Sequence, residues 1–208
     1  LSVVRKVPAG HNAVMKGRWA RDFFRGNQLA GKTLGVLGVG RLGGMMVDYG
    51  RGFRMKVIGC DHNPRRRIPN LAYLPFDQLA ARADVISIHI HLTPENEHFL
   101  DAERLGMMKN GVVLINTSRG KIIDEEALLA ALNSGKVGGF GADVIVGEWR
   151  DDLEQHPLIA YSRDHDHVTI LPHVGGITWE AQCMAYRFVA GKMAEIIRGW
   201  EGHSATVP

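Results

Sequence analysis

The sequence has only two cysteines, Cys60 and Cys183, and they lie far apart in the chain. This pattern resembles neither a secreted disulfide scaffold nor a zinc site, and it favours reduced thiols in a cytoplasmic protein. No apolar run approaches the roughly 18 to 20 residues that cross a membrane, and no basic segment followed by an apolar one marks an export signal at the amino terminus. We therefore expect a cytoplasmic protein with no membrane partner.

An excess of one charge is also missing. The 25 lysines and arginines are interleaved with 22 acidic residues, which gives a formal net charge of only +3. This balance argues against a nucleic-acid partner, and the short basic cluster Arg65-Arg66-Arg67 is more typical of a solvated loop. The 45% hydrophobic content and the 25 glycines describe a globular chain with many tight turns that can bury a sizeable core.

Between residues 33 and 171, short apolar runs alternate with amphipathic helical stretches. The runs are nearly continuous, as expected for strands buried on both faces of a parallel sheet. They lie at residues 34–37, 56–59, 85–90, 112–115, 140–144 and 168–171. This alternation predicts βαβ crossovers, and therefore an α/β fold with a doubly wound, mostly parallel sheet of the Rossmann type.

The helical stretches have recognisable features. Asp101 is a candidate N-cap, and Asp124-Glu125-Glu126 places acids at the start of another helix. A long helical stretch covers residues 177–198. Residues 1–25 read as mostly helical and polar. The helix after Gly43 is expected to have one apolar face, formed by Leu42, Met45, Met46, Tyr49 and Phe53. We expect the methionines on helix faces to fill the core; these are Met45, Met46, Met107 and Met108.

A glycine motif, Gly38-Val39-Gly40-Arg41-Leu42-Gly43, follows the first expected strand and opens a helix. In this context Gly38 permits a tight turn, Gly40 lets a pyrophosphate approach the backbone, and Gly43 allows close contact between helix and strand. The backbone amides of Arg41 and Leu42 at the helix start would hold the anion. The motif predicts a dinucleotide site.

Asp61 at the end of the next strand makes the prediction more specific. An acid there can accept hydrogen bonds from the adenosine ribose hydroxyls and repel a 2′-phosphate, so the sequence favours NAD over NADP. The arginines at 65–67 weaken this preference, because arginines near that position can bind the extra phosphate.

Further motifs resemble the D-isomer-specific 2-hydroxyacid dehydrogenases, and they occur in the same order along nearly the whole chain. They are the segments that begin at Gly31, His89, Met108, Asn116, Asp124 and Gly141, and the segment Pro172-His173-Val174-Gly175-Gly176. The resemblance implies a cofactor domain similar to that of phosphoglycerate dehydrogenase. It also implies a catalytic set of Arg119, Glu148 and His173.

The chemistry is consistent with these residue types. His173 can give or take a proton near neutral pH, Glu148 would orient its ring, and Arg119 would bind the substrate carboxylate. Trp149 stands where the family usually has proline, so the sequence departs from the family pattern directly after Glu148. The resemblance further implies cofactor contacts from Thr93, Pro94, Thr117, Ser118, Asp143 and Gly175.

His89 and His91 alternate along an expected strand and could face one side as metal ligands. No third ligand at a suitable spacing is evident, so we expect no metal.

The resemblance also implies a division of the chain. Residues 1–30 would form an interdomain helix and dimerisation arm, residues 31–176 the NAD-binding domain, and residues 177–208 a helix returning toward a substrate domain that this chain largely lacks. The sequence begins at Leu1 rather than Met, and we expect a fragment of a longer homodimeric protein.

The leading hypothesis is hydride transfer between NAD and a D-2-hydroxy acid or 2-oxo acid. The alternatives are an NAD(H)-sensing, non-catalytic module similar to transcriptional corepressors, and a formate dehydrogenase, which has glutamine in place of Glu148.

Overall fold

The computed structural model describes residues 1–63 and 67–201. It divides the chain into two compact units, Leu1–Pro172 and His173–Pro208. Arg65 and Arg66, which could affect the choice between NAD and NADP, lie outside the described residues.

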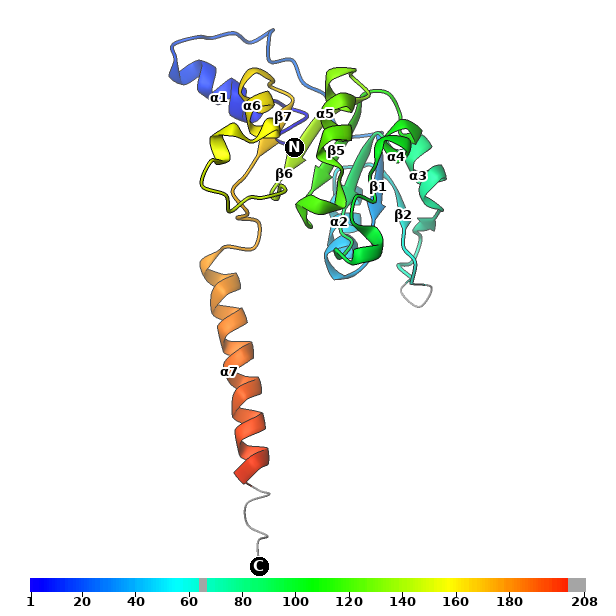
Figure 1. Cartoon of the computed structure of the whole chain (residues 1–208). Helices are drawn as coiled ribbons and strands as arrows, with labels where there is room; N and C mark the ends of the chain where they lie inside the picture. The colour runs from blue at the N-terminus through cyan, green and yellow to red at the C-terminus, as the bar shows by residue number, and fades with distance from the viewer. Residues whose placement is uncertain (64–66, 202–208) are drawn as a thin grey trace, which may run out of the picture. The chain divides into compact units, whose positions relative to one another are not determined.

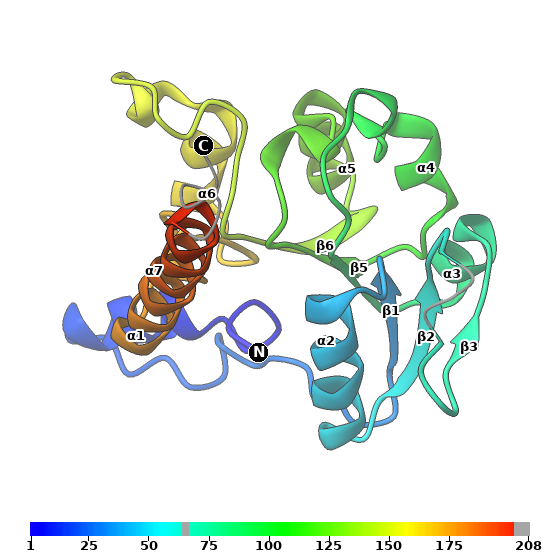
Figure 2. The same cartoon turned by 90° about the horizontal axis from the view of Figure 1, so that it is seen from below.

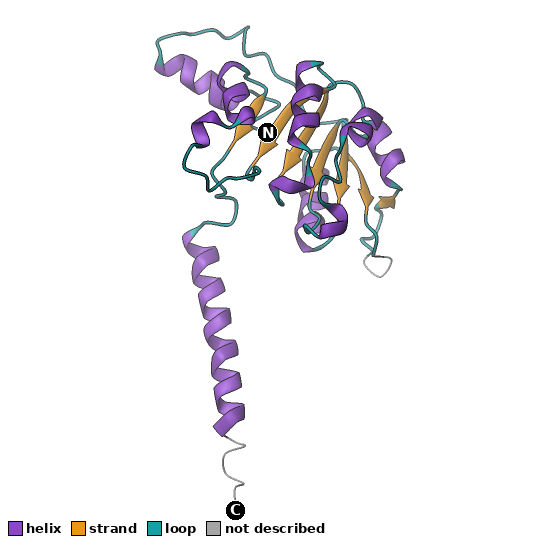
Figure 3. Ribbon diagram, in the orientation of Figure 1, coloured by secondary structure: helices purple, strands orange, loops and turns teal. Residues whose placement is uncertain are grey.

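The first unit is built on one sheet (Figure 3). Within the described residues this sheet has seven strands, all parallel, in the order β3-β2-β1-β4-β5-β6-β7. The strands are β1 (Thr33–Leu37), β2 (Lys56–Cys60), β3 (Ala72–Tyr73), β4 (Val85–Ile88), β5 (Val112–Asn116), β6 (Val137–Ala142) and β7 (Val168–Ile170). The chain moves outward from β1 to β3 and then returns to the other side of β1 at β4. The predicted doubly wound fold is confirmed, and its switch point lies between β1 and β4.

Helices cover both faces of the sheet, with α2 on one face and α3, α4 and α5 on the other (Figure 2). The helices of the first unit are α1 (Val7–Met15), α2 (Arg41–Gly52), α3 (Phe76–Arg82), α4 (Ala102–Met107), α5 (Glu125–Asn133) and α6 (Pro157–Asp164). Three short 3-10 turns are η1 (Pro94–Asn96), η2 (Gly120–Ile122) and η3 (Leu153–Gln155). Two apolar clusters fill the layers, the larger one including Leu79, Leu105 and Leu128 and the smaller one Val36 and Val47.

The predicted N-cap Asp101 is confirmed, and Asp124, predicted as one of the acids at a helix start, is an N-cap as well. Asp101 accepts a hydrogen bond from the backbone N–H of Arg104, at 2.8 Å. Asp124 accepts from the amides of Glu126 and Ala127, at 3.0 and 3.2 Å. Each carboxylate satisfies amides that the first turn of a helix leaves without an intrahelical partner.

The prediction that the large apolar residues of α2 form its core-facing side is wrong. The buried residues of α2 are Gly43, Val47 and Gly50, and most of the predicted face is exposed: Leu42 57%, Met45 48%, Tyr49 60% and Phe53 44%. The reason is the close approach of helix and strand, since a Cβ on Gly50 would lie 2.6 Å from a methyl of Leu34. Only small residues fit at this contact, so the large side chains point outward. Met107 is likewise exposed at 39%, whereas Met108 is buried and Met46 packs against the core, as predicted.

Several element ends also differ from prediction. β4 ends at Ile88 rather than at residue 90, β6 begins earlier, at Val137, and the two-residue strand β3 was not predicted. In the amino-terminal segment the helix is confined to Val7–Met15, so residues 1–25 are less helical than expected.

The second unit contains one long helix, α7 (Trp179–Glu201), coloured orange to red in Figure 1. It confirms the helix predicted at 177–198. Its apolar side chains are largely exposed, among them Met184, Phe188 and Met193. None of the helices in the described residues has the length and apolar character needed to cross a membrane.

Candidate functional site

The glycine loop lies at the carboxyl end of β1, at the switch point of the sheet. Gly38 has a φ of +90°, and a Cβ there would lie 2.7 Å from the carbonyl carbon and oxygen of His89, just beyond β4. A Cβ on Gly43 would lie 1.9 Å from the carbonyl oxygen of Gly38. Backbone therefore packs against backbone at both positions, and no larger residue fits there without displacing the loop.

The loop leads directly into α2, whose N-cap is Gly40 and whose first residue is Arg41. Helix geometry leaves the N–H groups of this first turn without intrahelical carbonyls, and Gly40 has no side chain to cap them. The first turn contains no acidic residue. The positive end of the helix dipole is therefore available to an anion such as a pyrophosphate.

Asp61 follows β2 and braces the glycine loop. One carboxylate oxygen accepts from the backbone N–H of Val39 at 2.6 Å, and the other accepts from that of Asn63 at 2.7 Å. Sequence reasoning assigned Asp61 to the ribose and missed this brace. A carboxylate has about four acceptor sites, so capacity remains for ribose hydroxyls.

Arg119 lies in a turn after β5 that the buried Asn116 organises. The Asn116 side chain accepts from the N–H of Ser118 at 3.0 Å and donates to the carbonyl of Arg119 at 2.9 Å. The Ser118 hydroxyl donates to the carbonyl of Ile88 at 2.8 Å, which joins the turn to the end of β4. The guanidinium donates to the Ser118 carbonyl at 2.6 Å, and the residue is exposed. Asn116 has a positioning role that the motif alone did not reveal.

Glu148 lies in a loop after β6. Asp143 is 6% exposed, and its N–H donates to the Asn116 carbonyl at 3.0 Å, so the loop starts beside the Arg119 turn. Gly147 has a φ of +66° and turns the chain immediately before Glu148. Trp149, at the position where the sequence departs from the family pattern, is 85% exposed.

Thr93 and Pro94 lie in the exposed turn that follows β4. Asn96 and Thr93 form a capping box, in which the Asn96 side chain accepts from the N–H of Thr93 at 2.8 Å. Thr117 is exposed at the end of β5. His173 and Gly175 belong to the second unit, so the meeting of His173 with Arg119 and Glu148 stays a prediction.

His89 and His91 do not share a strand, because β4 ends at Ile88. His89 is largely buried, and its Nε2 lies 2.9 Å from the Ser87 hydroxyl. Burial lowers the pKa of His89 from its ordinary value of 6.5 to about 4, so the ring is neutral. His91 is exposed, and the described residues contain no cluster of three or more histidines, cysteines or acids that could hold a metal.

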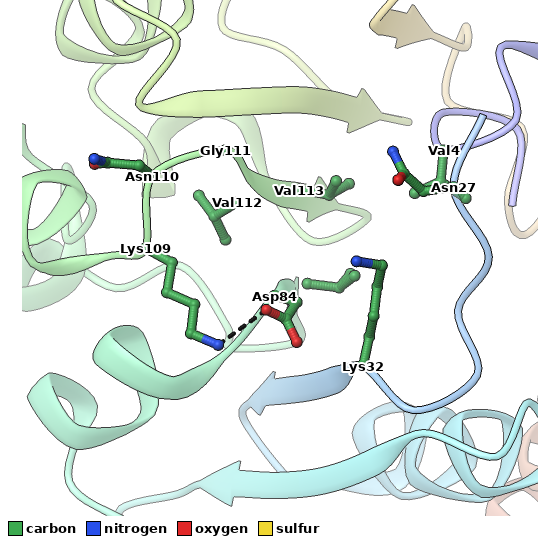
Figure 4. Close-up of a pocket in the computed structure, with 10 residues that line it drawn as sticks. Val4, Asn27, Lys32, Asp84, Lys109, Asn110, Gly111, Val112 and Val113 are labelled. Atoms are coloured by element: carbon green, nitrogen blue, oxygen red, sulfur yellow. Dashed lines mark hydrogen bonds and ion pairs between the residues drawn. The ribbon is translucent and has the colours of Figure 1, made fainter. Parts of the chain in front are cut away.

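A cavity of about 240 Å³ lies at the opposite edge of the sheet, at the amino ends of β1, β4 and β5 (Figure 4). On its wall Asp84 accepts from the Lys109 ammonium at 2.9 Å and from the N–H of Thr33 at 2.7 Å. Burial alone would raise the pKa of Asp84, but these two hydrogen bonds and the lysine charge lower it below its ordinary value. These bonds link the amino ends of β1 and β4, far along the strands from the glycine loop, and we assign Asp84 and Lys109 a structural role.

The sheet order, the close-packed glycine loop and the uncapped start of α2 define a dinucleotide-binding domain of the doubly wound α/β class. Comparison with known families is more specific. Residues 1–175 match the family described as D-isomer specific 2-hydroxyacid dehydrogenase, NAD binding domain, and the chain belongs to this family.

Curated relatives support the assignment. The chain is 36% identical over 203 residues to D-3-phosphoglycerate dehydrogenase of Methanocaldococcus jannaschii, covering 96% of this chain and 37% of that protein. It is 36% identical over 183 residues to hydroxypyruvate reductase of Thermotoga maritima, covering 88% and 58%. A solved structure of D-lactate dehydrogenase from Aquifex aeolicus, complexed with NAD and lactic acid, superposes with a TM-score of 0.85 at 31% identity, covering 95% of this chain and 63% of that one. The chain thus spans about one to two thirds of the length of these relatives.

Proposed function

We propose that this protein transfers a hydride between NAD and a D-2-hydroxy acid or its 2-oxo acid. The observation that carries the proposal is the Arg119 turn, which the Ser118 hydroxyl joins to the end of β4, beside the glycine loop. The position of this turn supports a role for Arg119 as the cation that binds the substrate beside a dinucleotide site. Relatives named for phosphoglycerate, hydroxypyruvate, glyoxylate and lactate support small 2-hydroxy or 2-oxo acids as the substrate class.

The residues present fit the cofactor. The first-turn amides of α2, including those of Arg41 and Leu42, would hold the pyrophosphate, and Asp61 would accept from the ribose hydroxyls. The close packing at Gly38 and Gly43 keeps the backbone within reach of the ligand. The remaining proposed contacts come from Gly40, Thr93, Pro94, Thr117, Ser118, Asp143 and Gly175.

Bound NAD supplies the hydride acceptor, or as NADH the donor. Arg119 binds the substrate carboxylate through its fork of N–H donors and polarises the neighbouring carbonyl. In the reductive direction Nε2 or Nδ1 of His173 gives its proton to the carbonyl oxygen, and in the oxidative direction it takes that proton back. Glu148 accepts from the other ring nitrogen, which orients the imidazole and favours its protonated form.

We propose the following division of the chain: an interdomain helix and dimerisation arm at residues 1–30, the NAD-binding domain at 31–176, and a carboxyl-terminal helical segment at 177–208, of which residues 202–208 lie outside the described residues. Exposed apolar side chains on the arm, Trp19 at 84% and Phe23 at 67%, support a homodimer. The two free thiols are consistent with the cytoplasm. Sedimentation equilibrium of the natural protein tests the homodimer, and a monomer at micromolar concentration would contradict it.

Turnover is tested on the natural full-length protein with NADH and a panel of 2-oxo acids. His173→Ala should reduce kcat by at least about a hundredfold, the contribution of a positioned acid–base group, while NADH binding stays within about twofold. Unchanged activity in this variant would remove His173 as the proton donor. No turnover on any acid, with NADH binding intact, would instead favour the non-catalytic sensing module.

The cofactor choice is tested separately. Asp61→Ala should weaken NADH binding more than NADPH binding, because only the unphosphorylated ribose gains from the carboxylate. Since Asp61 also braces Val39, thermal unfolding of the variant is measured in parallel. Equal weakening of both cofactors, at any stability, would exclude Asp61 from the ribose.

A further inference from the structure

The backbone of Val146 is held on both sides by two side chains that are far apart in the sequence. Its N–H donates to one carboxylate oxygen of Glu125 at 2.8 Å, and its carbonyl lies 2.9 Å from Nε2 of His156. The same nitrogen lies 3.2 Å from the second Glu125 oxygen. We call this arrangement the Val146 clamp, formed by Glu125 at the start of α5 and by His156 before α6.

The hydrogen-bond pattern assigns the tautomer of His156. Its Nδ1 accepts from the backbone N–H of Leu158 at 3.2 Å, so this nitrogen carries no proton. Nε2 therefore carries the proton and donates it to the Val146 carbonyl and to Glu125. The side chain is 3% exposed, so both ring nitrogens are used within the protein: one for the α6 cap and one for the clamp.

The surroundings of the Glu125 carboxyl group also change its pKa. Burial raises the pKa of Glu125 above its ordinary value, and the Val146 amide, His156 and His98 oppose that rise only in part. A half-buried acid that keeps these partners makes a specific contact rather than a solvated surface one.

The Arg119 turn packs against the Ile145–Val146 peptide, the one whose N–H donates to Glu125. A Cβ on Gly120 would lie 2.2 Å from the carbonyl carbon of Ile145 and 2.5 Å from the nitrogen of Val146. No side chain fits between these two backbones. The position of the Val146 peptide therefore depends on the clamp and on direct contact with the residue after Arg119.

Glu148 follows Val146 after a single residue, the left-handed Gly147. A shift of the Val146 peptide is therefore transmitted to Glu148 through one short turn, with no intervening regular structure. The segments that carry Arg119 and Glu148 are thus in direct backbone contact two to three residues before Glu148.

We propose that Glu125 and His156 are positioning residues, which hold the Val146 peptide against the Arg119–Gly120 turn and thereby place Glu148 relative to Arg119. Neither residue needs to touch substrate or cofactor for this role. The inference rests on the proposed function, in which Glu148 orients His173, and it adds two residues to which that function assigns no part.

Two substitutions of His156 separate positioning from stability. His156→Asn keeps an acceptor near Nδ1 for the α6 cap but removes the donor to Val146. His156→Gln places a donor near Nε2 for the clamp but loses the cap. Glu125→Gln keeps one oxygen for the Val146 N–H and turns a donor toward His156, so it breaks the clamp from the other side.

In the full-length protein we expect His156→Asn and Glu125→Gln to lower kcat roughly tenfold or more, as for a misplaced catalytic group, with NADH affinity within about twofold. Both variants should also lower the acid–base pKa in the pH profile of kcat, because a displaced Glu148 stabilises the imidazolium less. His156→Gln should retain kcat within about threefold and lose thermal stability. Hydrogen exchange of residues 146–148 should accelerate in His156→Asn and Glu125→Gln only.

Wild-type kcat and an unchanged pH profile in His156→Asn would overturn the inference, as would activity that follows thermal stability across the three variants. If His156→Asn does not fold, Glu125→Gln decides by the same criteria. Glu148→Gln is measured alongside. If it leaves kcat and the pH profile unchanged, the proposed role of Glu148 fails and the inference with it. If Glu148→Gln changes both kcat and the pH profile while His156→Asn and Glu125→Gln change neither, only the positioning inference fails.

Discussion

Lowering the pH below 6.5 should destabilise this protein in part through one buried histidine, His89. Burial lowers its pKa from the ordinary value of 6.5 to about 4 in the folded chain. Above pH 6.5 the ring is neutral in both the folded and the unfolded chain and contributes nothing to the pH dependence. Between pH 6.5 and about 4, His89 is protonated in the unfolded chain but largely neutral in the folded chain, so the free energy of unfolding falls as the pH falls.

The magnitude follows from the two pKa values. For a single group with these values, linkage predicts a loss of about 2 kcal/mol at pH 5 and about 3 kcal/mol at pH 4, relative to neutral pH. The loss matters because single domains are typically stable by only about 5–15 kcal/mol. It also bears on the site, since the His89 backbone packs directly against Gly38.

Urea unfolding followed by circular dichroism at about pH 7 and pH 5 measures this effect. His89→Gln keeps a side chain that can bond to Ser87 and cannot be protonated, so it should lose about 2 kcal/mol less than wild type over this interval. His91→Gln, which changes an exposed histidine two residues later, is the matched control and should behave like wild type. Equal pH dependence in wild type and His89→Gln would refute the reasoning.

Two further predictions concern the glycine loop and the thiols. Gly43→Ala should destabilise the fold by about 1–3 kcal/mol and weaken NADH binding by at least about tenfold, because its Cβ would lie 1.9 Å from the Gly38 oxygen. Calorimetry and fluorescence titration measure the two effects. Gly44→Ala is the control, because its Cβ would meet only a side-chain methyl at 3.4 Å. Burial and neighbouring carboxylates raise the pKa of the Cys60 thiol. At pH 7.5 Cys60 should therefore react with a disulfide reagent at least about tenfold more slowly than the exposed Cys183. The two single Cys→Ser variants allow each rate to be measured separately. Equal NADH affinity in the two alanine variants, or equal thiol rates, would contradict these assignments.

Much of the fold could be read from the sequence because its signals are local. Asp101 and Asp124 cap the predicted helices with their own side chains, over two or three residues. The apolar runs became strands within a few residues of their predicted bounds. The glycine spacing after β1 predicted the dinucleotide loop, because turn geometry and helix start follow from neighbouring residues.

The wrong predictions concern positions where packing between distant segments overrides the local sequence pattern. The apolar residues of α2 gave the wrong buried face, because the close approach to β1 admits only the small residues at Gly43 and Gly50. His89 and His91 were assigned to one strand face, although β4 ends before either of them.

The sequence alone supplied the order of the motifs and the choice of Gly38, Asp61 and Arg119 as candidate site residues, because each depends on chain neighbours and on side-chain chemistry. Only the tertiary structure decided that Asp61 braces the glycine loop, that the Ser118 hydroxyl joins the Arg119 turn to the end of β4, and that Glu125 and His156 meet at Val146. These contacts join residues that are far apart along the chain or come from different segments. They form only when parallel strands bring their carboxyl ends to one edge of the sheet, and no periodicity in the sequence records them.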